Sequence, residues 1–106
     1  MSDVVYRIDR FVVPAPARDA FLERVRQTHA VLRDCPGFVR DTLVEQPLAE
    51  GRSAILTLVE WTGQPAIEAA RDRVGAAQRA DGFRPAEFMA GLGVQAEFGV
   101  YRDLRP

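Results

Sequence analysis

The side chains in this sequence best suited to proton transfer are Arg7, Asp9 and His29. Arg7 and Asp9 are two residues apart in an alternating stretch, so they share one face of a strand. His29 follows Leu22 and Val25 at helical spacing and lies at the border of an apolar helix face. A carboxylate in an apolar cavity has a raised pKa and can act as a general base, as a histidine can near neutral pH. Arg7 could then hold a developing oxyanion.

Each of these residues also has a purely structural interpretation, which the sequence leaves open. Arg7 and Asp9 could form an ion pair or lie at a solvated strand end. His29 could be a packed or half-exposed histidine that binds no ligand. Cys35, next to Pro36 at a helix end, is expected to be a small buried hydrophobic residue.

Aromatic residues are candidate walls for a binding pocket. Trp61 has a large π surface and an indole N–H donor, which suit a flat aromatic ligand, although a core anchor at a strand end needs no ligand. Phe11 lies on the same strand face as the ionisable pair. The segment around a predicted short helix carries further apolar side chains that could form a pocket lid or pack in the core: Phe83, Phe88, Met89 and Leu92.

The composition excludes several classes of site. All fourteen basic residues are arginine, so no lysine can form a Schiff base. The single cysteine, Cys35, excludes an internal disulfide and a multi-thiolate zinc site. The single histidine, His29, excludes a multi-histidine metal centre within one chain. Since the chain also lacks a glycine loop that cradles phosphates, we expect no cofactor and no metal.

The charge and hydropathy of the sequence indicate which partners and which cellular compartment to expect. Fourteen basic residues face fifteen acidic ones, and the net charge is -1. No basic run marks a phosphate-binding face, which argues against nucleic acid as a partner. The first residues lack the apolar run of a signal peptide, and no stretch approaches the roughly 18 apolar residues that span a membrane. The chain is therefore expected to be cytoplasmic and without membrane contact.

Hydrophobic periodicity predicts the elements that position these residues. Period-two alternation predicts a strand over Val4–Val13, and helical spacing predicts a helix over Pro16–Asp34 that stops at Pro36 and Gly37. The remaining elements are expected in this order: strand Phe38–Glu45, a loop over Pro47–Arg52, strand Ser53–Trp61, a second helix capped by Thr62 with an apolar stripe of Ile67, Ala70, Val74 and Ala77, a break at Asp81, Gly82 and Pro85, a short helix Ala86–Ala90, and a strand with alternating Val94, Ala96, Phe98 and Val100.

This order, βαββαβ with an extra short helix, predicts an α+β fold of the ferredoxin-like type. Two main helices would pack on one face of a four-stranded antiparallel sheet, and residues 1–106 would form one domain. The third strand is almost continuously apolar from Ala54 to Val59, whereas a sheet with one face in water alternates. Its second face is expected to be buried against another copy through a two-fold interface, which predicts a homodimer.

Three short motifs, in this order and spacing, resemble the antibiotic biosynthesis monooxygenase (ABM) domains of the dimeric α+β barrel superfamily. The motifs are Phe11 at the end of the first strand, Pro36-Gly37-Phe38 after the first helix, and Glu60-Trp61 before the second helix. The resemblance covers nearly the whole chain. It implies that two ferredoxin-like domains pair into one dimeric barrel.

The resemblance implies a scaffold that supports cofactor-free oxygenation of polycyclic phenols, haem degradation or quinol modification. In the oxygenases, the Trp of the third strand lines a pocket between sheet and helices, with a polar residue four positions earlier. Here these positions are Trp61 and Thr57, where an Asn would be expected. Haem degraders carry an Asn where Asp9 falls and a ligand His late in the second helix, where residues 76–79 contain none. These departures disfavour haem breakdown. Many members of the family also have a His near the position of Ala70, which this chain lacks.

The leading hypothesis is a cofactor-independent monooxygenase that binds a flat phenolic or quinol-like molecule, removes a proton and lets the electron-rich anion reduce O2. Asp9 or His29 would be the base, Arg7 the anion stabiliser, and Trp61 with Thr57 the pocket walls. The alternative is a non-catalytic dimeric barrel that binds an apolar metabolite or haem. An interaction module without a ligand is the third interpretation.

Overall fold

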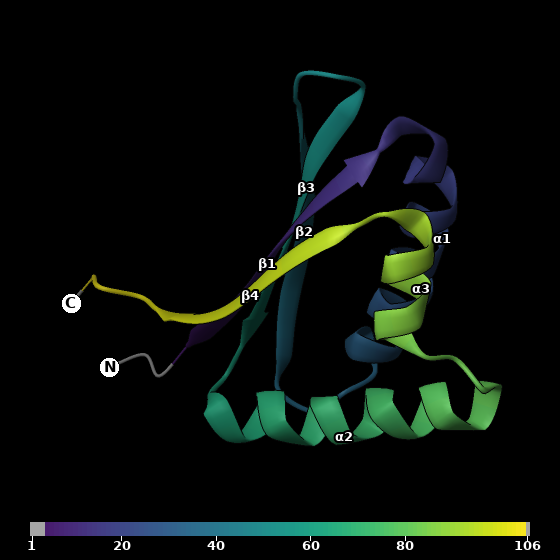
Figure 1. Ribbon diagram of the computed structural model, residues 1–106. Helices are drawn as coiled ribbons and strands as arrows, with labels where there is room; N and C mark the ends of the chain where they lie inside the picture. The colour runs from purple at the N-terminus through teal and green to yellow at the C-terminus, as the bar shows by residue number, and fades with distance from the viewer. Residues whose placement is uncertain (1–3, 106) are drawn as a thin grey trace.

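A four-stranded antiparallel sheet forms one layer of the molecule, and helices cover one of its faces (Figure 1). The computed structural model describes residues 4–105. The strands lie in the order β2-β3-β1-β4, so the ferredoxin-like α+β fold expected from the sequence is confirmed. The elements are β1 (Val5–Pro14), the 3-10 turn η1 (Ala15–Ala17), α1 (Arg18–Arg33), β2 (Phe38–Pro47), β3 (Arg52–Trp61), α2 (Gln64–Asp81), α3 (Pro85–Leu92) and β4 (Gln95–Arg102).

The elements lie close to their predicted positions, with shifts at their ends. α1 begins at Arg18 and not at Pro16, because the short turn η1 takes up the residues between β1 and the helix. β2 continues beyond the predicted end at Glu45, and β4 continues beyond Val100. None of the described helices is long and apolar enough to cross a membrane.

The prediction that Thr62 caps the second helix is wrong. α2 begins at Gln64, Gly63 occupies the N-cap position, and among the described residues no side chain caps this end. The backbone N–H of Thr62 instead donates to the carbonyl oxygen of Gly37 at 2.9 Å, and its hydroxyl lies close to the same glycine. This contact with the loop after α1 holds Thr62 in an orientation that does not serve the helix.

Gly37→Ala is expected to lower the free energy of unfolding by about 2–4 kcal/mol. Gly37 has a left-handed φ of +87°, and an added Cβ would lie 2.5 Å from the Cβ of Ala66 and 2.8 Å from the hydroxyl of Thr62. Gly51→Ala is the matched control, because its φ is +68° but no described atom lies within 4 Å of the added Cβ. Urea denaturation measures both variants. Equal losses would show that the close approach to Ala66 carries no cost.

Alternation along the strands sends the odd-numbered residues of β1 and β3 toward the helices. In the register of the sheet, Asp9 lies opposite Thr57 on β3 and opposite Phe98 on β4. The buried side chains of this face pack with the helices in two clusters. One cluster includes Phe11, Val13, Phe21, Leu22 and Ile55, and the other includes Cys35, Val59, Trp61, Ile67 and Ala70. The predicted burial of Cys35 is thereby confirmed.

The opposite face of the sheet, which we call the outer face, has no helix against it in the described part of the chain (Figure 1). The molecule is correspondingly flat, with extents of 44 × 35 × 17 Å. By alternation, the outer face presents Tyr6 and Ile8 of β1, Val44 of β2, Leu56 and Leu58 of β3, and Tyr101 of β4. Val44 and Tyr101 are 46% and 53% exposed. A largely apolar face of this kind is typical of an interface, so it supports the homodimer, which stays a prediction.

Candidate functional site

A cavity of about 380 Å³ lies between the helix side of the sheet and helices α1, α2 and α3. Its wall is mostly apolar. Among residues 4–105, no group of three or more His, Cys, Asp or Glu side chains is placed to hold a metal ion. The structure brings every proposed site residue to this one cavity, although their roles stay predictions: Arg7, Asp9, Phe11, His29, Thr57, Trp61, Phe83 and Phe88.

Arg7 and Asp9 form an ion pair on the wall that β1 contributes. The Nε of Arg7 donates to Oδ1 of Asp9 at 2.6 Å, and the two side chains are 29% and 16% exposed. Burial raises the pKa of the Asp9 carboxyl, although the hydrogen bond and the charge of Arg7 act in the opposite direction. The backbone of Gly99 on β4 also hydrogen-bonds to this carboxyl. Asp9 is therefore both a structural partner of Arg7 and a group with raised proton affinity.

Asp9→Asn is expected to stabilise the fold relative to the wild type by an amount that grows between about pH 4 and pH 7. Because the pKa of Asp9 is higher in the folded chain than in the unfolded chain, the carboxyl stabilises the fold fully at pH values below its pKa in the unfolded chain. This contribution to the free energy of unfolding is lost as the pH rises through its pKa in the folded chain. The amide carries no charge to desolvate and still accepts a hydrogen bond from Arg7. Urea denaturation across this range measures the change, which for one proton is at most about 1.4 kcal/mol per pH unit. A relative stability that falls with rising pH would contradict the raised pKa.

His29 lies on α1 and contacts a carboxylate of β2. Its Nδ1 is 2.9 Å from Oδ2 of Asp41, and the residue is only 7% exposed. Arg33, one turn further along α1, donates its Nη2 to the same Oδ2 at 2.9 Å. His29 is thus packed, as one interpretation of the sequence held, and also part of the cavity wall.

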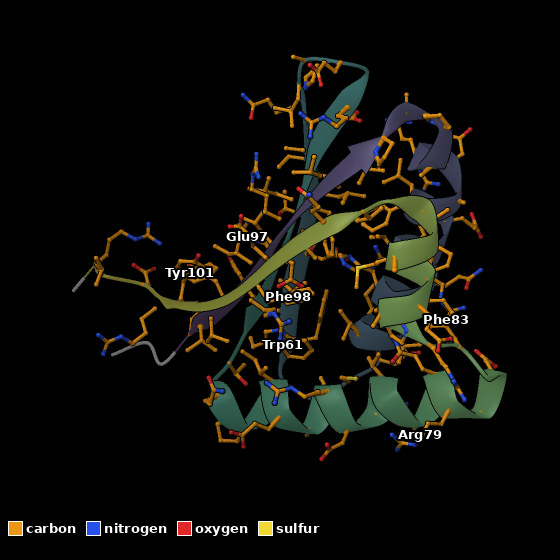
Figure 2. All side chains as sticks on the ribbon, viewed as in Figure 1. Trp61, Arg79, Phe83, Glu97, Phe98 and Tyr101 are labelled. Atoms are coloured by element: carbon orange, nitrogen blue, oxygen red, sulfur yellow. The ribbon has the colours of Figure 1, made fainter. Side chains whose placement is uncertain are left out.

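Aromatic rings from the sheet form another part of the wall. Trp61 is 2% exposed and meets Phe38 edge to face, with 5.8 Å between the ring centres. Figure 2 shows Trp61 and Phe98 on the side of the sheet that faces the helices, whereas Glu97 and Tyr101 lie on the other side of β4. The ring of Trp61 therefore serves as a core anchor and as a surface that a ligand in the cavity would meet.

Phe83 and Phe88 close the cavity on the side of α3. Their ring centres are 5.2 Å apart, and the guanidinium carbon of Arg24 lies 3.4 Å from the centre of the Phe83 ring. α3 buries none of its own residues, and among its side chains Met89 and Leu92 pack against the core while partly exposed. This arrangement agrees with both interpretations of the segment, as a lid and as a thinly packed part of the core.

Arg24 and Phe98 also line the cavity, and Asp41 contacts the site through His29. The alternation of the last strand places Phe98 on the same face as Ala96, so a signal for it was present. Asp41 has a weaker signal, because alternation gives its face on β2 but not the helix that it meets. Arg24 follows no pattern that distinguishes it from the other arginines of the chain.

Comparison with known proteins decides the family. The sequence pattern of the antibiotic biosynthesis monooxygenase family matches residues 4–91, which is most of the chain. The chain belongs to this family. The resemblance seen in the short motifs of the sequence is therefore confirmed for the ABM domain as a whole.

Solved structures of similar fold include SnoaB, a cofactor-independent oxygenase from Streptomyces nogalater. It is 30% identical with a TM-score of 0.68, over 99% of this chain and 97% of that chain. A single-residue variant of SnoaB gives 26% identity and a TM-score of 0.72 over the same shares. The heme-degrader MhuD from Mycobacterium tuberculosis, with two hemes in its active site, is 24% identical with a TM-score of 0.65, over 96% of this chain and 97% of that chain, which shows the fold alone. No curated protein sequence matches this ABM chain.

Proposed function

We propose that this ABM-family chain is a cofactor-independent monooxygenase that acts on a planar phenolic or quinol-like molecule. The observation that carries the proposal is a single mostly apolar cavity that holds two possible bases, Asp9 and His29, on different elements. The likeness to SnoaB, at 30% identity over nearly the whole of both chains, supports the same class of reaction.

The cavity suits a flat aromatic substrate. A volume of about 380 Å³ lies in the range of small-molecule sites. Trp61 and Phe11 offer ring faces or edges from the sheet, and Phe88 offers one from α3. Thr57, which is buried and lies opposite Asp9 in the register, adds one hydroxyl to this wall. The part of a substrate that lies against the apolar wall is shielded from water, which strengthens the electrostatic contacts that it makes there.

The proposed reaction begins when a base on the wall removes the phenolic proton. The anion that results transfers an electron to O2, so the substrate itself is the reductant. The two radicals combine in a carbon–oxygen bond at a ring carbon that carries hydrogen. The O–O bond and the C–H bond at that carbon then break, and loss of water leaves a quinone. One oxygen atom stays in the product and the other leaves as water. Arg7 stabilises the anion, and because its Nε is bonded to Asp9, the anion would meet its Nη groups.

Oxygen uptake with a panel of polycyclic phenols that carry a C–H bond at the ring position to be oxidised tests the proposal, with hydrogen peroxide assayed to exclude simple dehydrogenation. A substrate is expected to consume one O2 for each quinone formed and to quench the fluorescence of Trp61, the only tryptophan in the chain. Quenching without oxygen uptake for every compound would favour a binding protein. If no compound quenches Trp61 or consumes oxygen, the oxygenase and the ligand-binding protein are both ruled out. An interaction module without a ligand is then the favoured interpretation.

The second candidate function is binding of an apolar metabolite or haem without turnover, and the mostly apolar wall of the cavity favours it. A histidine-ligated haem fits these residues poorly, because His29 uses Nδ1 for Asp41 and residues 76–79 of α2 contain no histidine. Added haem is therefore expected to bind weakly and without a sharp histidine-ligated Soret band. A tight stoichiometric complex that His29→Ala abolishes would contradict this expectation.

We also propose that a second copy of the chain covers the outer face. Alternation places Ile8, Leu56 and Leu58 on that face, and each of them is only partly buried. Two-fold pairing of the same surface would bury these side chains in both copies at once. It would also give the dimeric barrel that the resemblance implies.

A further inference from the structure

We propose that Asp41 is the positioning residue that makes His29, and not Asp9, the base of this cavity. The inference rests on the proposed oxygenase function and names the group that takes the proton. It starts from the placement of a buried histidine of α1 between the cavity and a carboxylate of β2.

The contact with Asp41 fixes which ring nitrogen of His29 carries the hydrogen. Nδ1 lies 2.9 Å from Oδ2 of Asp41, and an ionised carboxylate can only accept a hydrogen bond. Nδ1 is therefore the donor, and in the neutral ring Nε2 keeps its lone pair. The ring lines the cavity and is 7% exposed, so water does not compete effectively for either nitrogen.

Arg33 holds the carboxylate of Asp41 in place. Its Nη2 donates to the same Oδ2 at 2.9 Å, and the side chain of Asp41 is only 17% exposed. His29 and Arg33 are four residues apart, so one face of α1 presents both groups to a single oxygen on β2. The carboxylate thus has two partners that keep it aimed at the imidazole ring.

Asp9 is less suited to take the proton. Its Oδ1 accepts the Nε of Arg7 at 2.6 Å, and the backbone of Gly99 adds a further hydrogen bond. Burial still raises the pKa of Asp9, but these two contacts stabilise its charged form and hold the carboxylate against Arg7 and β4. Asp9 then serves to orient Arg7 toward the anion.

The phenolic proton passes to His29 and later returns to the peroxide that forms on the substrate. The phenolic O–H bond of the substrate breaks, an Nε2–H bond forms on His29, and Asp41 stabilises the imidazolium through Nδ1–H. No electron passes through these residues. After the carbon–oxygen bond has formed, the imidazolium returns its proton to the terminal oxygen of the peroxide. The O–O bond and the C–H bond at the oxygenated carbon then break, and the hydroxide that leaves takes up the C–H proton to become water.

Nitrogen-15 NMR of the histidine ring tests the positioning role without any substrate. His29 is the only histidine, so its ring signals need no assignment. The neutral wild-type ring is expected to carry its hydrogen on Nδ1. In Asp41→Asn the amide can donate to Nδ1, and the hydrogen is expected to move to Nε2. Circular dichroism confirms that the variant is folded. A wild-type hydrogen on Nε2, or a tautomer that Asp41→Asn leaves unchanged, would overturn the proposal.

Steady-state kinetics with an active phenol from the panel tests the consequence for catalysis. Asp41→Asn is expected to lower kcat by about 100-fold or more while KM changes less than about twofold, because the variant alters proton transfer and keeps the shape of the cavity. Glu45→Gln is the matched control: it removes a carboxylate from the same strand, where Glu45 pairs with the exposed Arg18 and does not line the cavity. It is expected to leave kcat unchanged. A tautomer shift without a fall in kcat would overturn the assignment of His29 as the base.

The two measurements separate this inference from the proposed function. Failure of the wild type to oxidise every phenol in the panel would overturn the oxygenase proposal and the role of His29 as its base. The tautomer of His29 would still show whether Asp41 positions the ring. An active wild type with an unchanged Asp41→Asn variant would keep the oxygenase and discard the inference.

Discussion

Replacing His29 with glutamine is expected to lower kcat for an active phenol by about 100-fold to 10,000-fold, the usual contribution of a positioned general base. The glutamine amide can still donate to Asp41, so the wall of the cavity keeps its shape, but an amide cannot take up the substrate proton. Quenching of Trp61 by the same phenol should be nearly unchanged, since stacking does not depend on the base. Oxygen uptake and fluorescence titration of the same sample measure the two quantities.

Asp9→Asn provides the comparison that decides between the two candidate bases. It keeps the shape of the wall and the hydrogen bond from Arg7, and it is expected to lower kcat less than about tenfold, well below the loss for a general base. A larger loss for Asp9→Asn than for the glutamine variant of His29 would make Asp9 the base. Full activity in both variants would leave the cavity without a base among the residues considered.

Replacing Leu58 with aspartate is expected to split the proposed dimer or unfold it, at a cost of several kcal/mol. Leu58 alternates with the buried Thr57 and Val59, so its side chain lies on the outer face, where a two-fold partner would enclose the new charge. Sedimentation equilibrium at micromolar concentration is expected to give a dimer for the wild type and a monomer, or aggregated unfolded chain, for the variant.

Leu43→Asp is the matched control for the dimer experiment. Leu43 lies opposite Thr57 on the neighbouring strand, so it belongs to the helix side of the same sheet, and it is 40% exposed. The added charge can remain in water there, and the dimer is expected to persist. A wild-type chain that sediments as a monomer at these concentrations would refute the interface on the outer face.

The sequence was sufficient to place the wall of the cavity that the sheet contributes. Strand geometry gives each side chain a definite side, so alternation alone puts Arg7, Asp9 and Phe11 on one face, and the same rule places Trp61 once β3 is paired with β1. The residue types then indicate ionisable and aromatic groups on a shared surface. For these residues, the alternation of the sequence alone predicts which side chains are neighbours in the structure.

The pair of His29 and Asp41 could not be predicted in the same way. His29 lies on a helix and Asp41 on a strand, and their contact depends on how α1 packs across β2. The helical period of one segment and the strand period of the other do not determine that packing. The error at Thr62 has a related origin, because a residue type favours capping but a tertiary contact with Gly37 fixes the orientation that the side chain adopts. In both cases long-range packing decides between options that are locally equivalent.

The bare outer face also affects how the stability of this chain must be measured. If two copies associate through that face, folding and association are linked by mass action, and the midpoint of unfolding rises with total protein concentration. Each tenfold dilution then weakens the folded dimer by about 1.4 kcal/mol, which is comparable to the effect of a typical substitution. Variants such as Gly37→Ala and Asp9→Asn are therefore comparable only at one fixed chain concentration. A midpoint that does not move over a hundredfold dilution would instead identify a sheet that is stable with one face in water.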